Sequence, residues 1–418
     1  MNIIRPFIVI IIILTIISCA NDDSRQETFN TVWQTVNETF PDSAFGGKNW
    51  ESIKSTYEQN LSGITSDSEI CSLINKMLFE LNVSHTFIGP ISEIQQKASP
   101  YMFQPGSPGF DIRILDDEVI VTRIDNPQVE KSGLQPGCEL VSIDGYPVEE
   151  IISEASLMPP YNNRYKHFLQ TEEVLRHLYG QPESTFQIEY EDVNGSVQSQ
   201  KIIRIARENS IVLAPEIPPI YLECEWRKLE NEVGYLRFNA FQPENPTEVL
   251  AALDSLSDSK GLILDLRGNN GGSTSAQQAI GGRFFADTVA AAIIGTRHND
   301  DTLYYYGSHD TLTGPVVILV DEVSISAAEM FPAAMQSLNR ATIIGAQTPG
   351  AVMGGDLIFL NDSLCLVHPI FSVKTVQGIM LEGQGVIPDI EIALNKELLS
   401  KGIDTQLEAA KDYLKDKM

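Results

Sequence analysis

The sequence has 418 residues, of which 43% are hydrophobic and 8% aromatic, as expected of a globular protein with two or three domains. Its 29 basic and 56 acidic side chains give a formal net charge of −27. A surface this acidic repels phosphate groups, so the composition argues against a nucleic acid partner.

Residues 1–19 have the pattern of a lipoprotein signal peptide. Their apolar run from Phe7 to Ile17 is too short for a stable membrane span. A small residue then precedes Cys19, as in a bacterial lipobox, in which Cys19 would carry the lipid. The alternative is a leader that an ordinary signal peptidase cleaves elsewhere. Residues 20–27 are polar and predict a tether. We therefore expect a protein of the bacterial cell envelope, lipid-anchored at the outer membrane on its periplasmic or surface side.

Residues 28–95 predict an N-terminal helical domain with three amphipathic helices. Ser66 and Glu69 have the spacing of a capping box at the start of the third helix. Ser84 and His85 follow that helix directly. Taken alone, a histidine at the end of a helix is more often a surface or capping residue than a functional one.

Residues 105–206 predict short strands separated by turns. Their stretch SGLQPGCELVSIDGYPV resembles a PDZ domain, although Cys138 stands where that family often has Asp. Residues 158–180 predict an inserted helical segment. PDZ domains bind an extended peptide as an added strand, so the resemblance implies peptide docking at a strand edge near residues 109–112. The alternative is a PDZ-shaped spacer whose groove is blocked.

Residues 210–418 alternate strands and helices, as an α/β domain does. Their stretch GLILDL, residues 261–266, predicts a buried strand that ends in the loop RGNNGG, residues 267–272. Adjacent glycines allow the backbone to approach a ligand closely and to present N–H donors. A plain strand-to-helix turn would have the same pattern.

Residues 316–330, VVILVDEVSISAAEM, predict a strand, a turn with serines and the start of a helix. Backbone N–H groups in the first turn of a helix lack intrahelical partners and can face a developing oxyanion. We therefore nominate Ser326 as a nucleophile. On this segment alone, helix capping by Ser324 and Ser326 is the simpler interpretation.

Four segments together favour the catalytic interpretation. They are GLILDLRGNNGG, VDEVSISAAE, NRATIIG and EGQGVIPDIEI, in the order and spacing of the carboxyl-terminal processing and tricorn serine peptidases. The sequence is identified as a member of that group, and the resemblance extends over nearly all of the mature chain. It implies an α/β, crotonase-like core of the ClpP/crotonase type, with the N-terminal helical domain and the PDZ-like domain as satellites.

The group has two catalytic designs, and the residues discriminate between them. Processing peptidases use a Ser-Lys dyad whose lysine follows the nucleophile by 25 residues, where this sequence has Ala351, which cannot accept a proton. Tricorn-like peptidases use a histidine from a Ser-His motif and a glutamate before Gly-Val-x-Pro-Asp. The resemblance therefore implies that Ser326 is the nucleophile and His85 the base, and that Glu382 orients the imidazole through the Ser84 hydroxyl.

The resemblance also implies an oxyanion hole of backbone N–H groups from Gly271 or Gly272 and from Ala327. It implies no cofactor and no metal, since neither design uses one and the six histidines show no ligand spacing. The expected activity is hydrolysis of peptides or unfolded protein tails. Because every predicted catalytic residue lies outside residues 105–206, we expect that segment to govern substrate access rather than chemistry.

Two alternatives stay open for the whole chain. The first is a catalytically inactive lipoprotein that binds peptides or another ligand on the same scaffold. The second is a structural lipoprotein that only tethers partners. Against the first, none of Ser326, His85 and Glu382 is lost; the second leaves the glycine loop unexplained.

Overall fold

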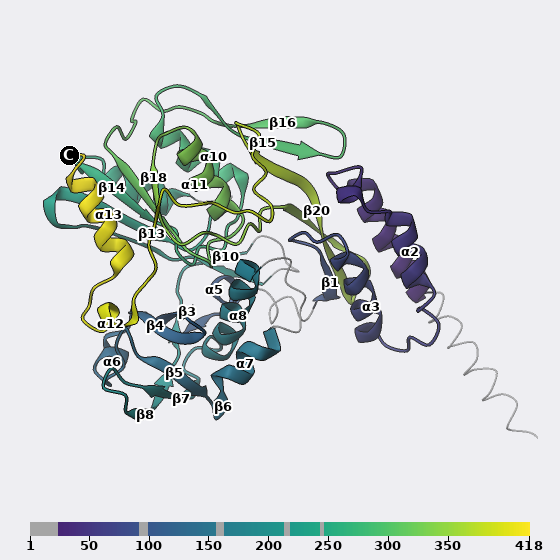
Figure 1. Cartoon of the computed structure of the whole chain (residues 1–418), viewed down its shortest axis with the longest axis horizontal. Helices are drawn as coiled ribbons and strands as arrows, with labels where there is room; N and C mark the ends of the chain where they lie inside the picture. Colours follow the sequence, from purple (N-terminus) through teal and green to yellow (C-terminus); the bar gives the residue numbers. More distant parts are fainter. Residues whose placement is uncertain (1–23, 92–98, 156–162, 213–217, 243–245) are drawn as a thin grey trace, which may run out of the picture. The chain divides into compact units, whose positions relative to one another are not determined.

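The computed structural model describes residues 24–91, 99–155, 163–212, 218–242 and 246–418. Contacts divide the chain into a smaller unit, residues 1–94, 295–299 and 353–372, and a larger unit that contains the rest. The chain thus begins in the smaller unit and returns to it twice (Figure 1). The predicted signal peptide with Cys19, and residues 20–23 of the predicted tether, lie outside the described residues.

The smaller unit contains helices and three paired strands. Its elements are a helix at residues 24–39, η1 (Phe45–Gly47), α2 (Trp50–Glu58), α3 (Asp67–Phe79), β1 (Phe87–Pro90), β19 (Gly354–Phe359) and the first part of β20 (Leu364–Thr375). Residues 24–27, which we expected in the tether, are helical. The capping box of α3 is confirmed, because Ser66 Oγ accepts the Glu69 N–H and the Glu69 carboxylate accepts the Ser66 N–H.

Strand β20 lies between β1 and β19 and pairs antiparallel with both. Phe87 of β1 lies opposite Val367 of β20. Leu364 and Leu366 of β20 belong to the same hydrophobic core as Ile74 of α3. The predicted helical domain at residues 28–95 is therefore completed by residues 353–372, which lie far away in the sequence.

The β-rich segment, residues 105–206, belongs to the larger unit. Its antiparallel sheet has the order β3-β4-β5-β7-β8, so β3 lies at an edge. The strands and main helices are β3 (Phe110–Leu115), β4 (Glu118–Ile124), β5 (Glu139–Ile143), β7 (Thr185–Glu191), β8 (Val197–Ile203), α7 (Val148–Ala155) and α8 (Asn163–Leu178). Helix α8 confirms that the predicted helical segment, residues 158–180, is helical over residues 163–178, whereas residues 158–162 lie outside the described residues. Cys138 is fully buried in the core of this segment.

The second sheet of the larger unit has six strands in the order β12-β13-β14-β17-β18-β21. All neighbours are parallel except β12 and β13. The elements are β12 (Cys224–Lys228), β13 (Val233–Phe238), α9 (Thr247–Ser255), β14 (Gly261–Asp265), α10 (Thr274–Gly281), β17 (Val316–Val320), α11 (Ala327–Ser337), β18 (Thr342–Gly345), β21 (Ile390–Glu391) and α13 (Thr405–Lys415).

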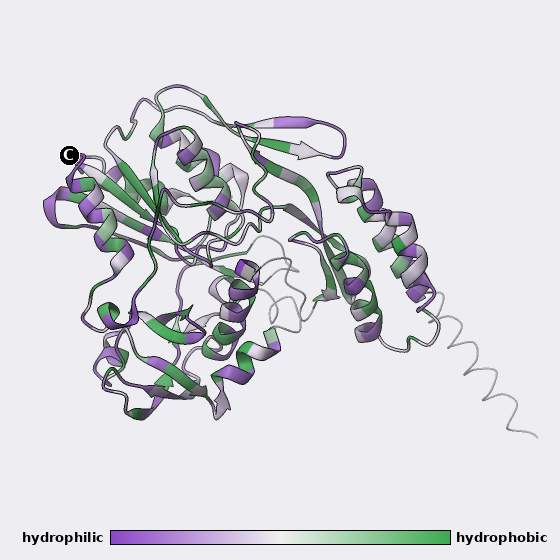
Figure 2. Cartoon of the chain, in the orientation of Figure 1, coloured by the Kyte–Doolittle hydropathy of each residue, from purple (hydrophilic) through white to green (hydrophobic). Residues whose placement is uncertain are grey.

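Helices cover both faces of this sheet. Ala410 and Leu414 of α13 pack against Val317 and Leu319 of β17, whereas α10 and α11 lie on the other side (Figure 1). Strands buried on both faces are apolar along their length, and the central strands show this (Figure 2). The protein thus has a mixed α/β fold with several sheets.

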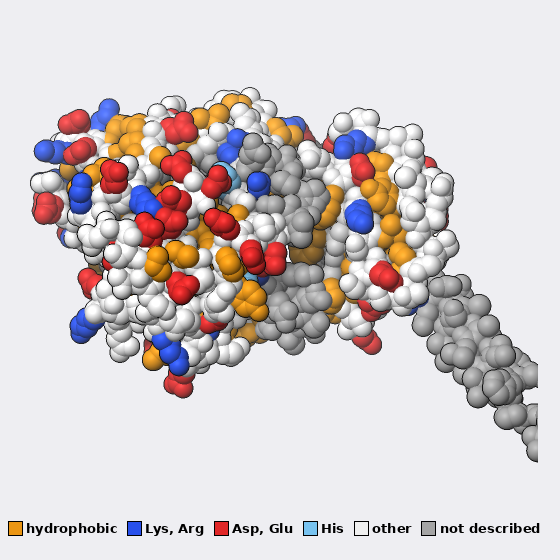
Figure 3. All heavy atoms as spheres, turned by 60° about the horizontal axis from the view of Figure 1, so that its bottom comes forward, with side chains coloured by type: hydrophobic (Ala, Val, Ile, Leu, Met, Phe, Trp, Pro, Cys, Tyr) orange, Lys and Arg blue, Asp and Glu red, His pale blue; other side chains and the backbone are white. Residues whose placement is uncertain are grey.

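The remaining elements are short connections and one hairpin. They are α5 (Pro100–Phe103), β2 (Gly106–Ser107), α6 (Pro127–Glu130), β6 (Tyr146–Pro147), β9 (Ile205–Ala206), β10 (Ser210–Ile211), β11 (Ile220–Tyr221), η2 (Glu230–Glu232), η3 (Gly282–Phe284), β15 (Val289–Thr296), β16 (Asp300–Tyr305) and α12 (Lys396–Leu399). Within the described ranges, no helix is both long and apolar enough to cross a membrane. Acidic side chains are scattered over the face drawn in Figure 3, in keeping with the net charge of −27.

Strands β14 and β17 are parallel neighbours, with Leu264 opposite Ile318. Their carboxyl ends therefore meet at one edge of the sheet, where binding and catalytic loops of open α/β sheets collect. The RGNNGG loop follows β14, and the turn with Ser324 and Ser326 follows β17. The fold thus brings two predicted site segments together.

Candidate active site

Ser326, the predicted nucleophile, is the N-cap residue of α11 and has φ 57° and ψ −120°. An L-residue with positive φ is strained and persists only where its surroundings enforce it. Here the Ser326 N–H donates to the Ala351 carbonyl oxygen at 2.9 Å and to Glu329 Oε2 at 3.1 Å. The turn after β17 therefore holds Ser326 in a defined, sharply bent position, half-buried.

The RGNNGG loop, residues 267–272, is called the glycine loop below. It packs directly against the turn of Ser326. A Cβ atom at Gly271 would lie 2.6 Å from Ser326 Cβ and 2.9 Å from the Ala327 nitrogen. A Cβ atom at Gly272 would lie 1.8 Å from the Phe241 carbonyl oxygen. All three distances are shorter than a normal van der Waals contact, so only glycine allows the backbone of the loop to come this close.

The three predicted oxyanion donors differ in their surroundings. The Gly271 N–H donates to Asn269 Oδ1 at 2.9 Å and is used within the loop. Gly272 pairs with Phe241 in a parallel bridge in which Phe241 makes both hydrogen bonds, so the Gly272 N–H points away from Phe241. Ala327 is the first residue of α11, where N–H groups lack intrahelical acceptors.

Asp321, which follows β17, organises the turn before Ser326. Its buried carboxylate accepts the N–H groups of Gly268 and Val323, both at 3.1 Å. The Ser324 hydroxyl lies 3.0 Å from Asp321 Oδ1 and 2.8 Å from the Leu266 carbonyl oxygen. Ser324 therefore ties the turn to the end of β14, which is a structural task distinct from that of Ser326.

Glu329 is fully buried one turn into α11. Besides the Ser326 N–H, its carboxylate accepts the Thr348 hydroxyl at 2.5 Å and the N–H groups of Gly350 and Ala351 at 2.6 and 2.8 Å. Burial raises the pKa of Glu329 to about 7, against the hydrogen bonds, which lower it. Glu329 thus fixes residues 348–351 against the start of α11.

Glu382, the predicted orienting carboxylate, comes after β20 in the chain and belongs to the larger unit. Its Oε2 atom accepts the Val352 N–H at 2.8 Å. Val352 follows Ala351, whose carbonyl oxygen accepts the Ser326 N–H. Residues 351–352 therefore connect the turn of Ser326 to the carboxylate of Glu382 through the backbone.

Ser84 and His85 belong to the smaller unit. Ser84 Oγ lies 2.9 Å from His85 Nδ1, and it accepts the Met353 N–H at 3.3 Å. His85 has φ 54°, and Gly355 leaves room for its side chain, since a Cβ atom there would lie 3.2 Å from His85 Cβ. Burial lowers the pKa of His85 to about 4, so the ring is neutral at pH 7 and able to accept a proton.

The structure thus groups the predicted residues into two sets. Ser326, Ala327, Gly271, Gly272 and Glu382 lie in the larger unit. Ser84 and His85 lie in the smaller unit, with residues 353–372.

Sequence reasoning missed two carboxylates, Glu329 and Asp321. The Ser-x-x-Glu spacing of Ser326 and Glu329 is that of a capping box and could have indicated the first. Arg113 donates from Nε to Asp321 at 2.6 Å, and both side chains are buried. These two residues are 208 positions apart, so no local pattern could have revealed the pair.

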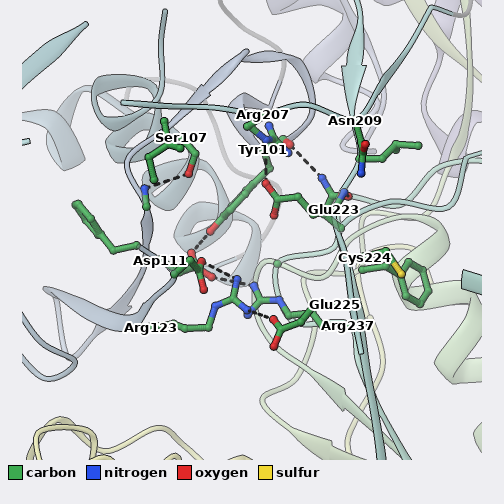
Figure 4. A pocket seen from close by; sticks show the side chains of 18 of the residues that line it. Tyr101, Ser107, Asp111, Arg123, Arg207, Asn209, Glu223, Cys224, Glu225 and Arg237 are labelled. Carbon is green, nitrogen blue, oxygen red and sulfur yellow. Dashed lines mark hydrogen bonds and ion pairs between the residues drawn. The ribbon is translucent and has the colours of Figure 1, made fainter. Parts of the chain in front are cut away.

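The cavity shown in Figure 4 is separate from these residues. It has a volume of about 610 Å³ and lies between the β-rich segment and the second sheet, and none of the predicted site residues is among those that line it. Its arginines already have acidic partners: Arg123 pairs with Glu225, Arg207 with Glu223, and Arg237 with Asp111. With these charges paired, nothing here marks a site for an anion.

Comparison with known proteins shows matches to two families of domains. Residues 232–392 match peptidase family S41, and residues 21–79 match the tricorn protease C1 domain. The carboxyl-terminal-processing protease of Synechocystis sp. is 22% identical over 391 residues, which covers 91% of this chain and 85% of that protein.

Two solved structures share the fold. The photosystem II D1 C-terminal processing protease has a TM-score of 0.56 and 20% identity, covering 90% of this chain and 96% of its own. Mature CPAF complexed with lactacystin has a TM-score of 0.61 and 12% identity, covering 94% and 97%. The chain therefore contains a domain of peptidase family S41, and it is a serine peptidase similar to the carboxyl-terminal-processing proteases.

Proposed function

We propose that this peptidase cleaves peptide bonds with Ser326 as nucleophile, His85 as base and Glu382 as orienting carboxylate. The observation that carries the proposal is the strained position of Ser326 at the start of α11, against Gly271 and beside the first helical N–H group. A serine held there can attack a carbonyl carbon whose oxygen faces backbone N–H groups.

The proposed proton path follows from the contact between Ser84 and the histidine ring. The Ser84 hydroxyl is in contact with His85 Nδ1, so Nε2 is the nitrogen that would take the proton from Ser326 and return it to the leaving amine. Ala351 supports this design over a Ser-Lys dyad, because its methyl group has no proton acceptor. Glu382 would act on His85 through Ser84.

Two N–H groups are proposed to form the oxyanion hole, those of Gly272 and Ala327. Gly272 is exposed and its N–H points away from Phe241, whereas the Gly271 N–H is engaged by Asn269. Each such donor contributes about 3 kcal/mol to transition-state stabilisation. Gly271 would then serve to let the loop approach Ser326.

We further propose a PDZ-like role for residues 105–206 and a crotonase-like core for residues 210–418. The edge position of β3 supports strand addition. At Ile112, however, the backbone N–H donates to Asp111 Oδ1 and the carbonyl oxygen accepts from Arg113. A peptide joining β3 at Ile112 would have to displace these side chains, which favours docking nearer to residues 109–110.

Peptides or unfolded protein tails in the bacterial cell envelope are the proposed substrates, with a lipid anchor at Cys19. The support is the signal-peptide pattern of residues 1–19 and the carboxyl-terminal-processing activity in the name of the Synechocystis relative.

Labelling with a fluorophosphonate probe, combined with hydrolysis of an unfolded polypeptide, tests the proposal. Wild type should react in both assays, and Ser326→Ala in neither. Ser275→Ala, an exposed serine near the glycine loop, is the matched control and should behave as wild type. A protein that binds the polypeptide without label or cleavage would instead be an inactive binding protein on this scaffold.

A further inference from the structure

Arg164, in the first turn of α8, reaches two loops near the predicted catalytic residues. Its Nε atom donates to the Thr348 carbonyl oxygen at 3.1 Å. Its Nη2 atom donates to the carbonyl oxygens of Gly383 and Gln384, each at 3.1 Å. One planar guanidinium thus binds three backbone carbonyls on two loops, a geometry that a lysine ammonium does not reproduce.

Both loops are connected to the predicted chemistry. Residues 348–351 are held by Glu329, which also accepts the Ser326 N–H. Residues 383–384 follow Glu382 directly. The two loops also touch each other, since the Gly383 N–H donates to the Gly350 carbonyl oxygen at 2.8 Å.

The loop after Glu382 has two backbone hydrogen bonds of its own, in which the Gln384 and Gly385 N–H groups donate to the Leu381 carbonyl oxygen at 3.0 and 2.8 Å. Gly383 and Gly385 have φ 73° and 69°, and glycine loses more backbone entropy on ordering than any other residue. Contacts from outside the loop offset this cost. Besides the Gly383 to Gly350 bond, Gln347 donates to the Gln384 carbonyl oxygen at 2.8 Å, and Arg164 supplies two further bonds from a separate part of the chain.

We infer that Arg164 is a positioning residue for Glu382, by which helix α8 of the β-rich segment braces the loop that carries this carboxylate. The inference rests on the proposed role of Glu382. It assigns to the β-rich segment a part in the chemistry, in addition to any part in substrate access.

The test compares Arg164→Ala and Arg164→Lys with Arg176→Ala, a control on the same helix whose guanidinium pairs with Glu173 one turn away. Fluorophosphonate labelling, kcat and KM for a short peptide, and thermal unfolding are measured. Both Arg164 variants should lose about 100-fold in kcat with KM and Tm nearly unchanged, as a misplaced catalytic group would cause. Guanidinium ion at millimolar concentration should restore part of the activity of Arg164→Ala alone.

An Arg164→Ala variant with the labelling rate and kcat of wild type would overturn the inference. So would a variant whose loss of activity accompanies a fall in Tm and is not reversed by guanidinium. Failure of the proposed function looks different, because wild type itself would then be unreactive. In that case hydrogen–deuterium exchange still decides. Amides of residues 383–386 should exchange faster in Arg164→Ala than in Arg176→Ala. Equal exchange rates would show that Arg164 does not hold this loop.

Discussion

At the scale of single residues, Ser326 and His85 both have left-handed backbone conformations, φ 57° and 54°. Such strain persists only where packing and hydrogen bonds enforce it, and it collects at functional sites. Ser326 is enforced by Gly271, the Ala351 carbonyl oxygen and Glu329. The ring of His85 is in contact with Ser84, whose Oγ atom lies 2.9 Å from His85 Nδ1.

His85→Ala should reduce peptide hydrolysis by several orders of magnitude while the protein still folds, because the base is lost. His298→Ala, at an exposed position, is the control and should retain full activity. Adding Ala351→Lys to His85→Ala should not restore hydrolysis, since residues around buried Ala351 are packed for a methyl group. Steady-state kinetics check this, and comparable activity of His85→Ala would remove His85 from the mechanism.

Gly271→Ala should abolish labelling of Ser326, because its Cβ atom would lie 2.6 Å from Ser326 Cβ. Gly378→Ala is a matched control, since Gly378 also has positive φ, 86°, but has open space around its Cα atom. Both variants should lose about 1–2 kcal/mol of stability from the left-handed backbone. Only the first should lose labelling, and equal labelling of the two would show that the close approach does not matter.

Glu329 should make stability depend on pH. Burial raises its pKa to about 7, whereas an unfolded glutamate titrates near 4.3. The folded state therefore binds the proton more tightly, so this contribution is complete below about pH 4.3 and is lost as the pH rises to about 7. The loss amounts to about 3–4 kcal/mol. The free energy of unfolding in urea, measured between pH 4 and 8, should fall less steeply with pH in Glu329→Gln than in wild type. The same pH dependence in variant and wild type would contradict the raised pKa.

At the scale of elements, the sequence predicted the features that depend on residues close together in the chain. The apolar strand at residues 261–266, the capping box at Ser66 and the helix within residues 158–180 all have their cause in neighbouring residues. The pairing of β1 with β20 joins segments that are far apart in the chain, with Phe87 opposite Val367, 280 positions later, so no periodicity indicated it. The same holds for Arg113 and Asp321, and for Arg164 and Gly383.

Arg113→Met should lower the free energy of unfolding by about 3–5 kcal/mol, because it leaves buried Asp321 without its cation and Asp111 with only Arg237 as a cationic partner. It should also slow labelling of Ser326, since Asp321 shapes the turn. Arg123→Met, which removes partly exposed pairs with Asp125 and Glu225, should cost less than about 1 kcal/mol. Urea denaturation of both variants provides the comparison, and similar small losses would show that the buried pair is not needed.

At the scale of the whole molecule, the sequence predicts that residues 105–206 control access without taking part in the chemistry. The contacts of Arg113 with Asp321 and of Arg164 with the loop after Glu382 support the inference that this segment also positions residues near Ser326 and Glu382. Residue identities located the candidate nucleophile, base and carboxylate. The residues that hold the turn of Ser326 and the loop of Glu382, among them Arg164, Gly271 and Glu329, come from distant parts of the chain, and only the folded structure brings them together.

The lipid anchor is a prediction for the whole molecule as well. Cys19→Ala should abolish incorporation of a labelled fatty acid and leave the protein unanchored or unprocessed, because the thiol that would carry the lipid is gone. Ser18→Ala keeps a small residue before Cys19 and should still be labelled. Fatty acid that persists in the Cys19 variant would refute the lipobox.

The central claim is that Ser326 is the nucleophile of a Ser-His-Glu peptidase. Peptide mapping by tandem mass spectrometry after fluorophosphonate treatment tests it most directly. The adduct should be on Ser326 in wild type and should form far more slowly in His85→Ala and Glu382→Gln. An adduct on any other residue, or unchanged labelling of Ser326 in both variants, would contradict it.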